Sequence, residues 1–491
     1  MIKIDKKFKK VVILDTVIFY PEHRKLLNAI AEEVLEYPTS LPENLEKQYE
    51  QNPDIFLNKK CYTHIAINDT SKQLLMNRVD GADVIISCWT DIPDEIIRLN
   101  PQLKLIIFWT HEKEHRINME LAEELGITVS NIPDYGTDAV AEVVFAGLFE
   151  LIQRNFKTDK ISNNSISNAI TNCVFNHFRL LRDNEKNTRS GRFTHHFHKI
   201  GEAKFDFNIK KINELIPERL VEYKRVGLLN IINYQDAVKS LEALRVICSI
   251  YNARDNSVAE YYKFLAQNDL IIYDSSRLGV EEVKRISIMF GYKLVDIKSL
   301  SFSDYSYSEK TFGIVGLGRI GKKVAKIAVE LGFKVVYYSK TRNKELEKQI
   351  GIDFISLEKL AEVSDVISIH LPAHKAENLF SDKLIRKIKN GLIFINTADG
   401  NAVDQKALTQ RMLNEEIYAF LDVYPGLPRK DVLGMEMKEK KDWKIQKELP
   451  KSVISYRSGW KTQESIAVKT YKLIGEMLSF LIENKDNYVL K

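Results

Sequence analysis

A glycine-rich turn between two apolar stretches limits the folds open to this chain. Residues 311–339, "TFGIVGLGRIGKKVAKIAVELGFKVVYYS", place Gly316, Gly318 and Gly321 in a G-x-G-x-x-G pattern. A strand is expected before the pattern, a helix after it and a second strand next, which is the context that a dinucleotide-binding unit requires. Gly316 permits a tight turn, Gly318 lets the backbone approach a pyrophosphate, and Gly321 lets helix and strand pack closely. The first turn of the helix then offers free N–H groups to the phosphates.

The same alternation of short apolar runs and helix-length segments continues through most of the chain. It predicts parallel sheets with helices on their faces. Apolar residues at helical spacing predict one long helix over 137–155. From 156 to 305 polar and basic stretches precede a renewed strand–helix pattern, in which 235–251 are expected to be helical and "DLIIYDSSRLGVEEVKRISIMFGYKLVDI" reads strand, turn, helix, strand. We therefore expect an α/β protein that contains an α/β insertion.

Composition narrows the class of protein. The 491 residues carry 72 Lys and Arg against 67 Asp and Glu, so the charge balance gives no general attraction to nucleic acid or membrane. The four cysteines are far apart and are expected to be buried thiols rather than disulfides. No run approaches the length of a membrane span, and Asp15 interrupts the first apolar run. We expect a soluble, cytoplasmic protein without a signal peptide.

The end of the second strand bears on the choice of dinucleotide. An acid at this place would bind the ribose 2′-OH of NAD. This chain has Ser339, Lys340, Thr341 and Arg342 instead. Two cations and two hydroxyls favour the 2′-phosphate of NADP(H), with NAD(H) still possible. The alternative is that Lys340 and Arg342 are simply solvated.

Several segments in the same order resemble the D-isomer-specific 2-hydroxyacid dehydrogenase family, and in texture its glyoxylate and hydroxypyruvate reductases. They are "AEVVFAGLFELIQRN" (141–155), "GIVGLGRIG" (313–321), "SDVISIHLP" (364–372), "GLIFINTADG" (391–400) and "LDVY" (421–424), together with "LNPQLKLIIFWT" and "GITVSNIP". The resemblance covers nearly everything outside the insertion.

The resemblance implies two Rossmann-like, doubly wound parallel-sheet domains with cofactor and substrate bound between them. Residues 1–131 and 461–491 would form a flavodoxin-like substrate-binding domain, 132–155 and 306–460 the dinucleotide-binding domain, and 156–305 an insertion of unknown role. It also implies a small-molecule substrate and a homodimer. The residues expected to line the dinucleotide are those of the turn and of the later strand ends: Gly316, Gly318, Arg319, Ile320, Gly321, Ser339, Lys340, Arg342, His370, Pro372, Thr397 and Asp422.

The family's catalytic residues do not match. The resemblance implies an arginine for the substrate carboxylate, a glutamate and a histidine, and these places hold Asp399, Leu427 and Arg457. "FWTHEKEHRIN" replaces the glycine-rich turn whose N–H groups would hold the same carboxylate. A carboxylate that approached Asp399 in a low-dielectric site would be repelled. An ordinary 2-oxo acid is therefore a poor fit in the usual pose.

Other residues could take over these roles. Asp399 and Arg457 are expected to form a salt bridge, which would either close the site or bind an amine and an anion. Tyr456, His111 and His115 are the candidate proton donors, although a solvated loop also accounts for the two histidines. His195, His196 and His198 lack further ligands at metal-binding spacing, so no metal is expected. Nucleic-acid binding by the basic, aromatic stretch 179–225 is not favoured, because acids dilute it.

Two functions from different classes remain open. The first is an NAD(P)-dependent oxidoreductase with an atypical substrate, since the dinucleotide apparatus looks intact. The second is a catalytically silent NAD(P)-binding sensor or partner-binding protein on the same scaffold, since fold alone does not fix function.

Overall fold

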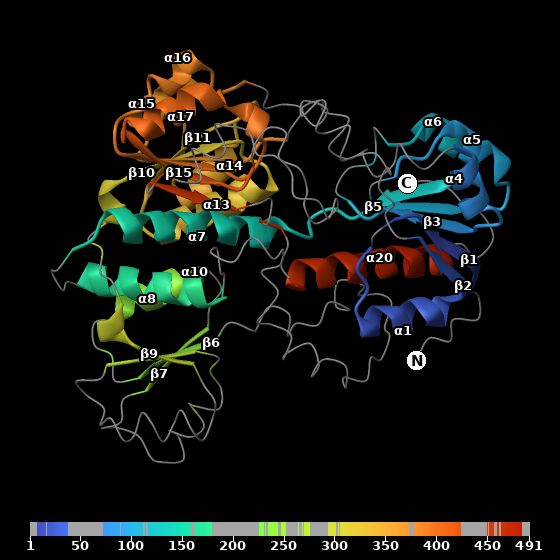
Figure 1. Cartoon of the computed structure of the whole chain (residues 1–491), viewed down its shortest axis with the longest axis horizontal. Coiled ribbons are helices and arrows are strands. Elements are labelled where there is room, and N and C mark those ends of the chain that lie inside the picture. The colour runs from blue at the N-terminus through green and yellow to red at the C-terminus, as the bar shows by residue number, and fades with distance from the viewer. Residues whose placement is uncertain are drawn as a thin grey trace.

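The computed structural model consists of three parallel sheets with helices packed against them (Figure 1). The residues that it describes are 7–15, 17–37, 72–88, 90–110, 113, 116–158, 163–178, 225–229, 231, 234–243, 247–251, 264, 268, 270–274, 293–300, 303, 305–372, 378–423, 449, 451–455, 459–460 and 463–483. The predicted α/β class is confirmed. No helix in these ranges combines the length and the apolar character that crossing a bilayer requires.

The first sheet has the strand order β2-β1-β3-β4-β5. Its strands are β1 (Phe8–Ile13), β2 (Ala31–Glu36), β3 (Val84–Ser87), β4 (Leu105–Phe108) and β5 (Thr128–Asn131). Helices α1 (Pro21–Ile30) and α20 (Gln463–Glu483) pack on one face. Helices α4 (Lys72–Val79), α5 (Asp94–Leu99) and α6 (Met119–Glu124) pack on the other. This is the flavodoxin-like order, and it joins the first part of the chain to its last described helix.

The second sheet has the order β12-β11-β10-β13-β14-β15-β16. The strands are β10 (Thr311–Val315), β11 (Lys334–Tyr338), β12 (Asp353–Phe354), β13 (Val366–Ile369), β14 (Leu392–Asn396), β15 (Ile417–Leu421) and β16 (Ser452–Ile454). One face carries α7 (Thr137–Asn155), α13 (Arg319–Glu330) and α14 (Lys344–Ile350), and the other carries α15 (Leu357–Val363), α16 (Asp382–Ile385) and α17 (Gln405–Leu413). This is the Rossmann order with one added strand.

Strand β10 is the first strand of this sheet along the chain, and β11 and β13 flank it. The strands that follow β10 are thus added first on one side of it, as β11 and β12, and then on the other side, from β13 onwards. In open α/β sheets such a switch point, at the carboxyl ends of the strands, is where ligands bind. The glycine turn and His370 both follow strands at this point.

The third sheet belongs to the inserted segment and has the order β7-β6-β8-β9. Its strands are β6 (Arg225–Leu229), β7 (Ile247–Tyr251), β8 (Leu270–Tyr273) and β9 (Lys293–Asp296). Helices α8 (Asn163–Phe178) and α10 (Gln235–Ala243) share its core, and they also contact α7 and α13 respectively. Figure 1 shows α8 and α10 lying between α7 and the third sheet. A bridge between Lys157 and Ser303 brings the two ends of the insertion together.

The helix expected over 235–251 is wrong in its second half. Helix α10 ends at Ala243, and "ICSIY" forms strand β7, paired in parallel with β6. Ile247, Cys248 and Ile250 suit a strand, and pairing with β6 outweighs the helical spacing of the apolar residues before them.

Candidate dinucleotide-binding site

Gly316 directly follows β10 and has a backbone conformation that favours glycine. Its φ is +98°, and a Cβ there would lie 2.7 Å from the carbonyl oxygen of His370. Its N–H donates to the carbonyl of Tyr338 over 2.8 Å. The turn is thus fixed between the ends of β11 and β13, as the first glycine of the pattern requires.

The two glycines that follow meet different surroundings. A Cβ on Gly321 would lie 2.0 Å from the carbonyl oxygen of Gly316, so the helix packs directly on the turn. Gly318 is the N-cap of α13, has an ordinary φ of −75° and has no atom within 4 Å of where its Cβ would be. The open space beside Gly318 adjoins the first N–H groups of α13, which no side chain of the cap satisfies. That is the arrangement in which a helix terminus binds a phosphate.

Two side chains beyond the turn carry buried polar atoms that have no hydrogen-bond partner among the described residues. His370 follows β13, and neither of its ring nitrogens has a hydrogen-bond partner. Burial lowers the pKa of His370 to about 3, so the ring is neutral near pH 7. The hydroxyl of Thr397, which follows β14, is likewise buried and unpaired. Unsatisfied buried polar atoms are rare in proteins, and at a switch point they fit a site that a ligand completes.

Asp422 follows β15, and its carboxylate accepts hydrogen bonds from two residues that follow β16. One carboxylate oxygen accepts from the hydroxyl of Ser455 and the other from the N–H of Gly459 over 3.0 Å. A Cβ on Gly459 would lie 2.8 Å from that second oxygen. Asp422 therefore holds the chain that leaves β16. Pro372 is exposed near His370.

Asp399 is buried and caps its own turn. Its side chain is 4% exposed, and Oδ1 accepts from the N–H of Asn401 over 3.0 Å at the start of the short helix Gly400–Ala402. The side-chain amide of Asn396 donates to the carbonyl of Asp399 over 2.8 Å. The carboxylate thus has a local structural role that its sequence position did not reveal.

The end of β11 holds the residues expected to select the dinucleotide. Arg342 forms an ion pair with Glu347 of α14, with 2.8 Å between Nη2 and Oε2. The hydroxyl of Tyr337 donates to the same carboxylate. This pairing raises the pKa of Arg342 and lowers that of Glu347. Lys340 is exposed, so one cation is engaged and the other is solvated.

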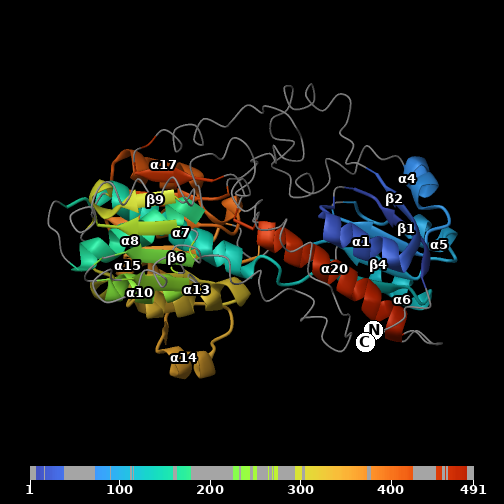
Figure 2. The same ribbon diagram turned by 90° about the horizontal axis from the view of Figure 1, so that it is seen from below.

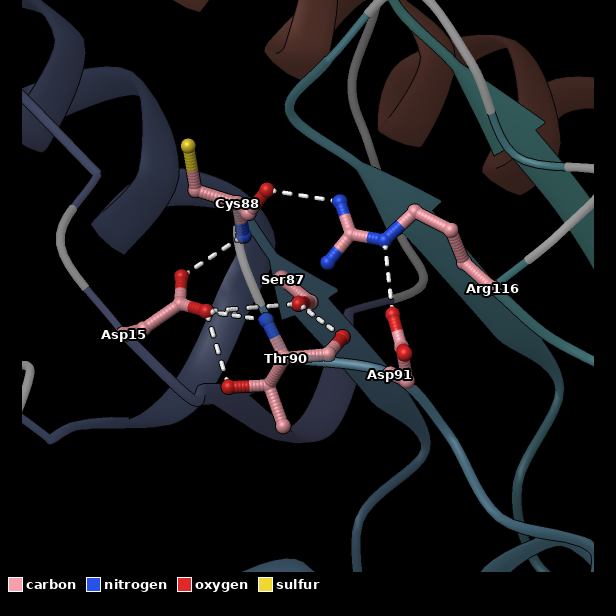
Figure 3. Close-up of polar contacts among 6 residues, drawn as sticks. All are labelled: Asp15, Ser87, Cys88, Thr90, Asp91 and Arg116. Carbon is pink, nitrogen blue, oxygen red and sulfur yellow. Dashed lines mark hydrogen bonds and ion pairs between the residues drawn. The ribbon is translucent and has the colours of Figure 1, made fainter. Parts of the chain in front are cut away.

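A polar cluster not anticipated from the sequence lies at the carboxyl end of the first sheet (Figure 3). Asp15 accepts from the N–H groups of Cys88 and Thr90, over 2.6 and 2.7 Å, and from the hydroxyl of Thr90 over 2.9 Å. Arg116 donates to Asp91 and to the carbonyl of Cys88, over 3.0 and 2.7 Å. The interruption of the first apolar run by Asp15 was the one sequence signal for this cluster.

The other residues of the predicted catalytic site belong to segments outside the described ranges. Tyr456, Arg457, His111, His115 and Leu427 lie outside the described residues. The expected contact between Asp399 and Arg457 therefore stays a prediction. The same holds for the histidines at 195, 196 and 198. Among the described residues no group of three or more His, Cys, Asp or Glu side chains is arranged to hold a metal.

Comparison with known sequences identifies the part of the chain that carries the glycine turn. Residues 292–438 match the family described as D-isomer specific 2-hydroxyacid dehydrogenase, NAD binding domain. This segment is therefore similar to the dinucleotide-binding domain of that family. The predicted resemblance is thereby confirmed, and with it a domain of the kind that binds a nicotinamide dinucleotide.

Curated reductases match the chain over segments of about the same length as the family match. A glyoxylate reductase of Thermococcus litoralis is 40% identical over 131 residues, which are 26% of this chain and 40% of that protein. A hydroxypyruvate reductase of Thermotoga maritima is 34% identical over 130 residues, 26% of this chain and 42% of that protein. The matched segment thus spans about two fifths of the length of these relatives.

Solved structures of 2-hydroxyacid dehydrogenases are similar in fold over almost the whole chain. The NAD-complexed D-isomer specific enzyme from Lactobacillus delbrueckii ssp. bulgaricus aligns with a TM-score of 0.53 over 98% of this chain and 100% of that chain, at 15% identity. D-2-hydroxyisocaproate dehydrogenase aligns with a TM-score of 0.52 at 15% identity. At such identities the likeness shows the fold alone.

Proposed function

We propose that this protein is an NAD(P)-dependent oxidoreductase that acts on a substrate other than an ordinary 2-hydroxy or 2-oxo acid. The observation that carries the proposal is the cradle at the β10–β13 switch point. There Gly316 and Gly321 shape the turn, and Gly318 borders open space at the start of α13. His370 and Thr397 offer buried polar atoms that lack partners among the described residues. The residues present fit a dinucleotide, whose nicotinamide would give or take a hydride.

The choice of an atypical substrate follows from Asp399. The family resemblance puts the arginine that binds a substrate carboxylate at this place, and the carboxylate found there is 4% exposed. In a site that excludes water it repels a second carboxylate by several kcal/mol. It would instead attract an ammonium or iminium group, while Arg457 would bind an anionic part of the same molecule.

Proton transfer would fall to Tyr456, His111 or His115. In the sequence Tyr456 comes shortly after β16, and His111 and His115 come in the segment after β4. Substrates of such folds bind at the carboxyl ends of parallel strands. In this proposal His370 serves as a neutral hydrogen-bonding group, because its low pKa leaves it no proton to give near neutral pH.

The domain division and the assembly are part of the proposal. Residues 1–131 and 461–491 would bind a small-molecule substrate, and 132–155 with 306–460 the dinucleotide. NADP(H) is favoured over NAD(H) for two reasons. The hydroxyl of Ser339 and the cations of Lys340 and Arg342 could bind a 2′-phosphate, and no carboxylate directly follows β11 to bind a 2′-OH. We also propose that the protein forms a homodimer and acts in the cytoplasm.

The test has a binding step and a turnover step. NADPH and NADH are titrated by calorimetry, and their consumption is then followed with a panel of 2-oxo acids, aldehydes, imines and amino compounds. We expect binding, turnover of at least one imine or amine and little turnover of 2-oxo acids. Binding without turnover on any substrate would favour a catalytically silent sensor. Absence of binding would reject both readings.

A double variant tests the role of Asp399. Asp399→Arg with Arg457→His restores two of the family's three residues and leaves Leu427 in place. We expect only weak 2-oxo acid reduction from it. Efficient reduction would contradict a remodelled substrate site. The single variant Asp399→Ala controls for loss of the cap on Asn401, because alanine has no acceptor for that N–H.

A further inference from the structure

Lys469 is a fully buried lysine enclosed by aromatic rings. Its residue is 1% exposed and belongs to helix α20. The ammonium nitrogen lies 3.7 Å from the ring centroid of Trp109, 4.3 Å from that of Tyr135 and 5.0 Å from that of Trp460. A cation is attracted to the faces of such rings, and most strongly when water is excluded.

The three rings come from three separate parts of the chain. Trp109 directly follows β4 of the first sheet. Tyr135 lies in the first crossover, residues 132–136, which joins β5 to α7. Trp460 lies in the second crossover, residues 455–462, which joins β16 to α20 and of which 455, 459 and 460 are described. Lys469 therefore contacts the first sheet and both connections between the two large sheets.

The two crossovers also touch each other and α20. Tyr135 and Trp460 pack edge to face, with 6.0 Å between ring centroids. A Cβ on Gly136 would lie 3.2 Å from the Cβ of Trp460. One turn along α20, Lys472 donates to the carbonyls of Pro133 and Asp134 over 3.3 and 3.0 Å. The crossovers thus meet in one packed cluster. Figure 2 shows helix α20 extending from the first sheet towards the lobe that contains α7.

Beyond this cluster each crossover is fixed to the dinucleotide-binding sheet. The second is held by Asp422 through Ser455 and Gly459. The first leads into α7, which packs so closely on β15 that a Cβ on Gly147 would lie 2.2 Å from the ring of Phe420. Tyr135 and Trp460 therefore lie between these contacts with the dinucleotide-binding sheet and the contacts with α20.

We propose that Lys469 is a positioning residue that sets the orientation of the first sheet relative to the dinucleotide site. Burying an ammonium costs free energy that an apolar side chain of the same length would avoid. A charge fixes direction where apolar contact does not, because three ring faces must converge on one nitrogen. If the proposed hydride transfer takes place, it needs the substrate-binding residues held at the correct distance from the nicotinamide. This inference deepens the proposed function and depends on it only for that last step.

The test compares Lys469→Met with Lys469→Arg and the parent protein. Methionine keeps length and apolar packing but removes the charge, whereas arginine keeps a cation that stacks on rings. Amide hydrogen exchange of the protein without ligand is the main measurement. In Lys469→Met we expect exchange in 132–137 and 459–463 to rise about tenfold or more, with β10 and β13 unchanged. Lys469→Arg should restore most of the protection.

Fluorescence gives a second measurement, since Trp109 and Trp460, two of the four tryptophans, flank the ammonium. Loss of the cation should shift their emission. Unchanged exchange in both crossovers, or a rise shared by β10 and β13, would overturn the inference. Should Lys469→Met fail to fold, Tyr135→Leu removes one ring and is expected to increase exchange in the same two segments, and unchanged exchange there would likewise overturn it.

Turnover separates this inference from the proposed function. We expect the NADPH affinity of Lys469→Met to stay within about twofold of that of the parent protein and its kcat to fall about tenfold. Altered crossovers would change the placement of the substrate relative to the dinucleotide more than they change dinucleotide affinity. If the parent protein shows no turnover, the proposed function fails while the exchange result still decides the role of Lys469. A parent-like kcat in a variant with increased exchange would reject the positioning role.

Discussion

Gly318 differs from its neighbouring glycines because its missing side chain leaves space open rather than relieving a clash. Gly318→Val should therefore fold normally and lose dinucleotide binding by at least about a hundredfold, since the side chain would occupy the place of the pyrophosphate. Gly321→Ala should instead destabilise the fold by about 1–3 kcal/mol through overpacking. Calorimetric titration and urea unfolding separate the two effects. Normal binding by Gly318→Val would remove the main support for a nucleotide site.

Glu347 controls how freely Arg342 can bind a 2′-phosphate. Glu347→Gln removes the ion pair but keeps an acceptor for Tyr337. We expect NADPH affinity to rise several-fold, up to about tenfold, with NADH affinity unchanged, because the released guanidinium gains a charge-assisted contact. Arg342→Gln should lower NADPH affinity alone. Equal responses of NADPH and NADH in paired titrations would show that this strand end does not select the dinucleotide.

Strand β16 and the chain after it depend on Asp422. Asp422→Ala removes acceptors for Ser455 and Gly459 in a buried place, and should cost about 2–4 kcal/mol of unfolding free energy. Asp422→Asn keeps one oxygen and should cost less than half as much. Urea unfolding measures both. A loss below about 0.5 kcal/mol for Asp422→Ala would mean that these hydrogen bonds contribute little.

Sequence patterns predicted some elements closely and missed others for physical reasons. The helix expected over 137–155 is α7 itself, and its nearly continuous burial arises because α8 covers the side turned away from the sheet. The β10–α13–β11 unit follows from glycine spacing, which local sterics determine. Strand β7 was missed because pairing with β6 is a tertiary effect that its own sequence does not reveal.

The candidate site was predictable where it depends on backbone conformation and not where it depends on contacts between distant segments. The spacing of Gly316 and Gly321 indicated their roles directly. The capping by Asp399 needed the turn itself, and the rings around Lys469 come from positions more than 300 residues apart at the extremes. No periodicity in one segment reports such a cluster.

Across the whole molecule, two buried histidines make stability depend on pH. Burial lowers the pKa of both His23, in α1, and His370 to about 3. Below pH 6.5 the unfolded chain binds protons at these residues and the folded chain does not, so stability falls as pH falls from about 6.5 towards 3. Between pH 7 and pH 5 each should remove about 2 kcal/mol.

Urea unfolding without ligand at pH 7 and pH 5 measures this loss. His370→Leu should make the loss of unfolding free energy between pH 7 and pH 5 smaller by about 2 kcal/mol, and the contribution of His23 should stay. An unchanged pH dependence in that variant would show that His370 is protonated in the folded protein. Carboxylates contribute equally to parent and variant, so the difference between them isolates the histidine.

The bridge between Lys157 and Ser303 has a consequence for how this protein can be divided. A segment whose two ends lie in contact can be exchanged for a short linker without stretching the host, so the third sheet is a separable module in a mechanical sense. What its removal would uncover is the outer side of α7, whose apolar surface would then meet water. Removing the inserted segment would therefore leave the connection of the chain intact, but the dinucleotide-binding domain would need another cover for the apolar side of α7.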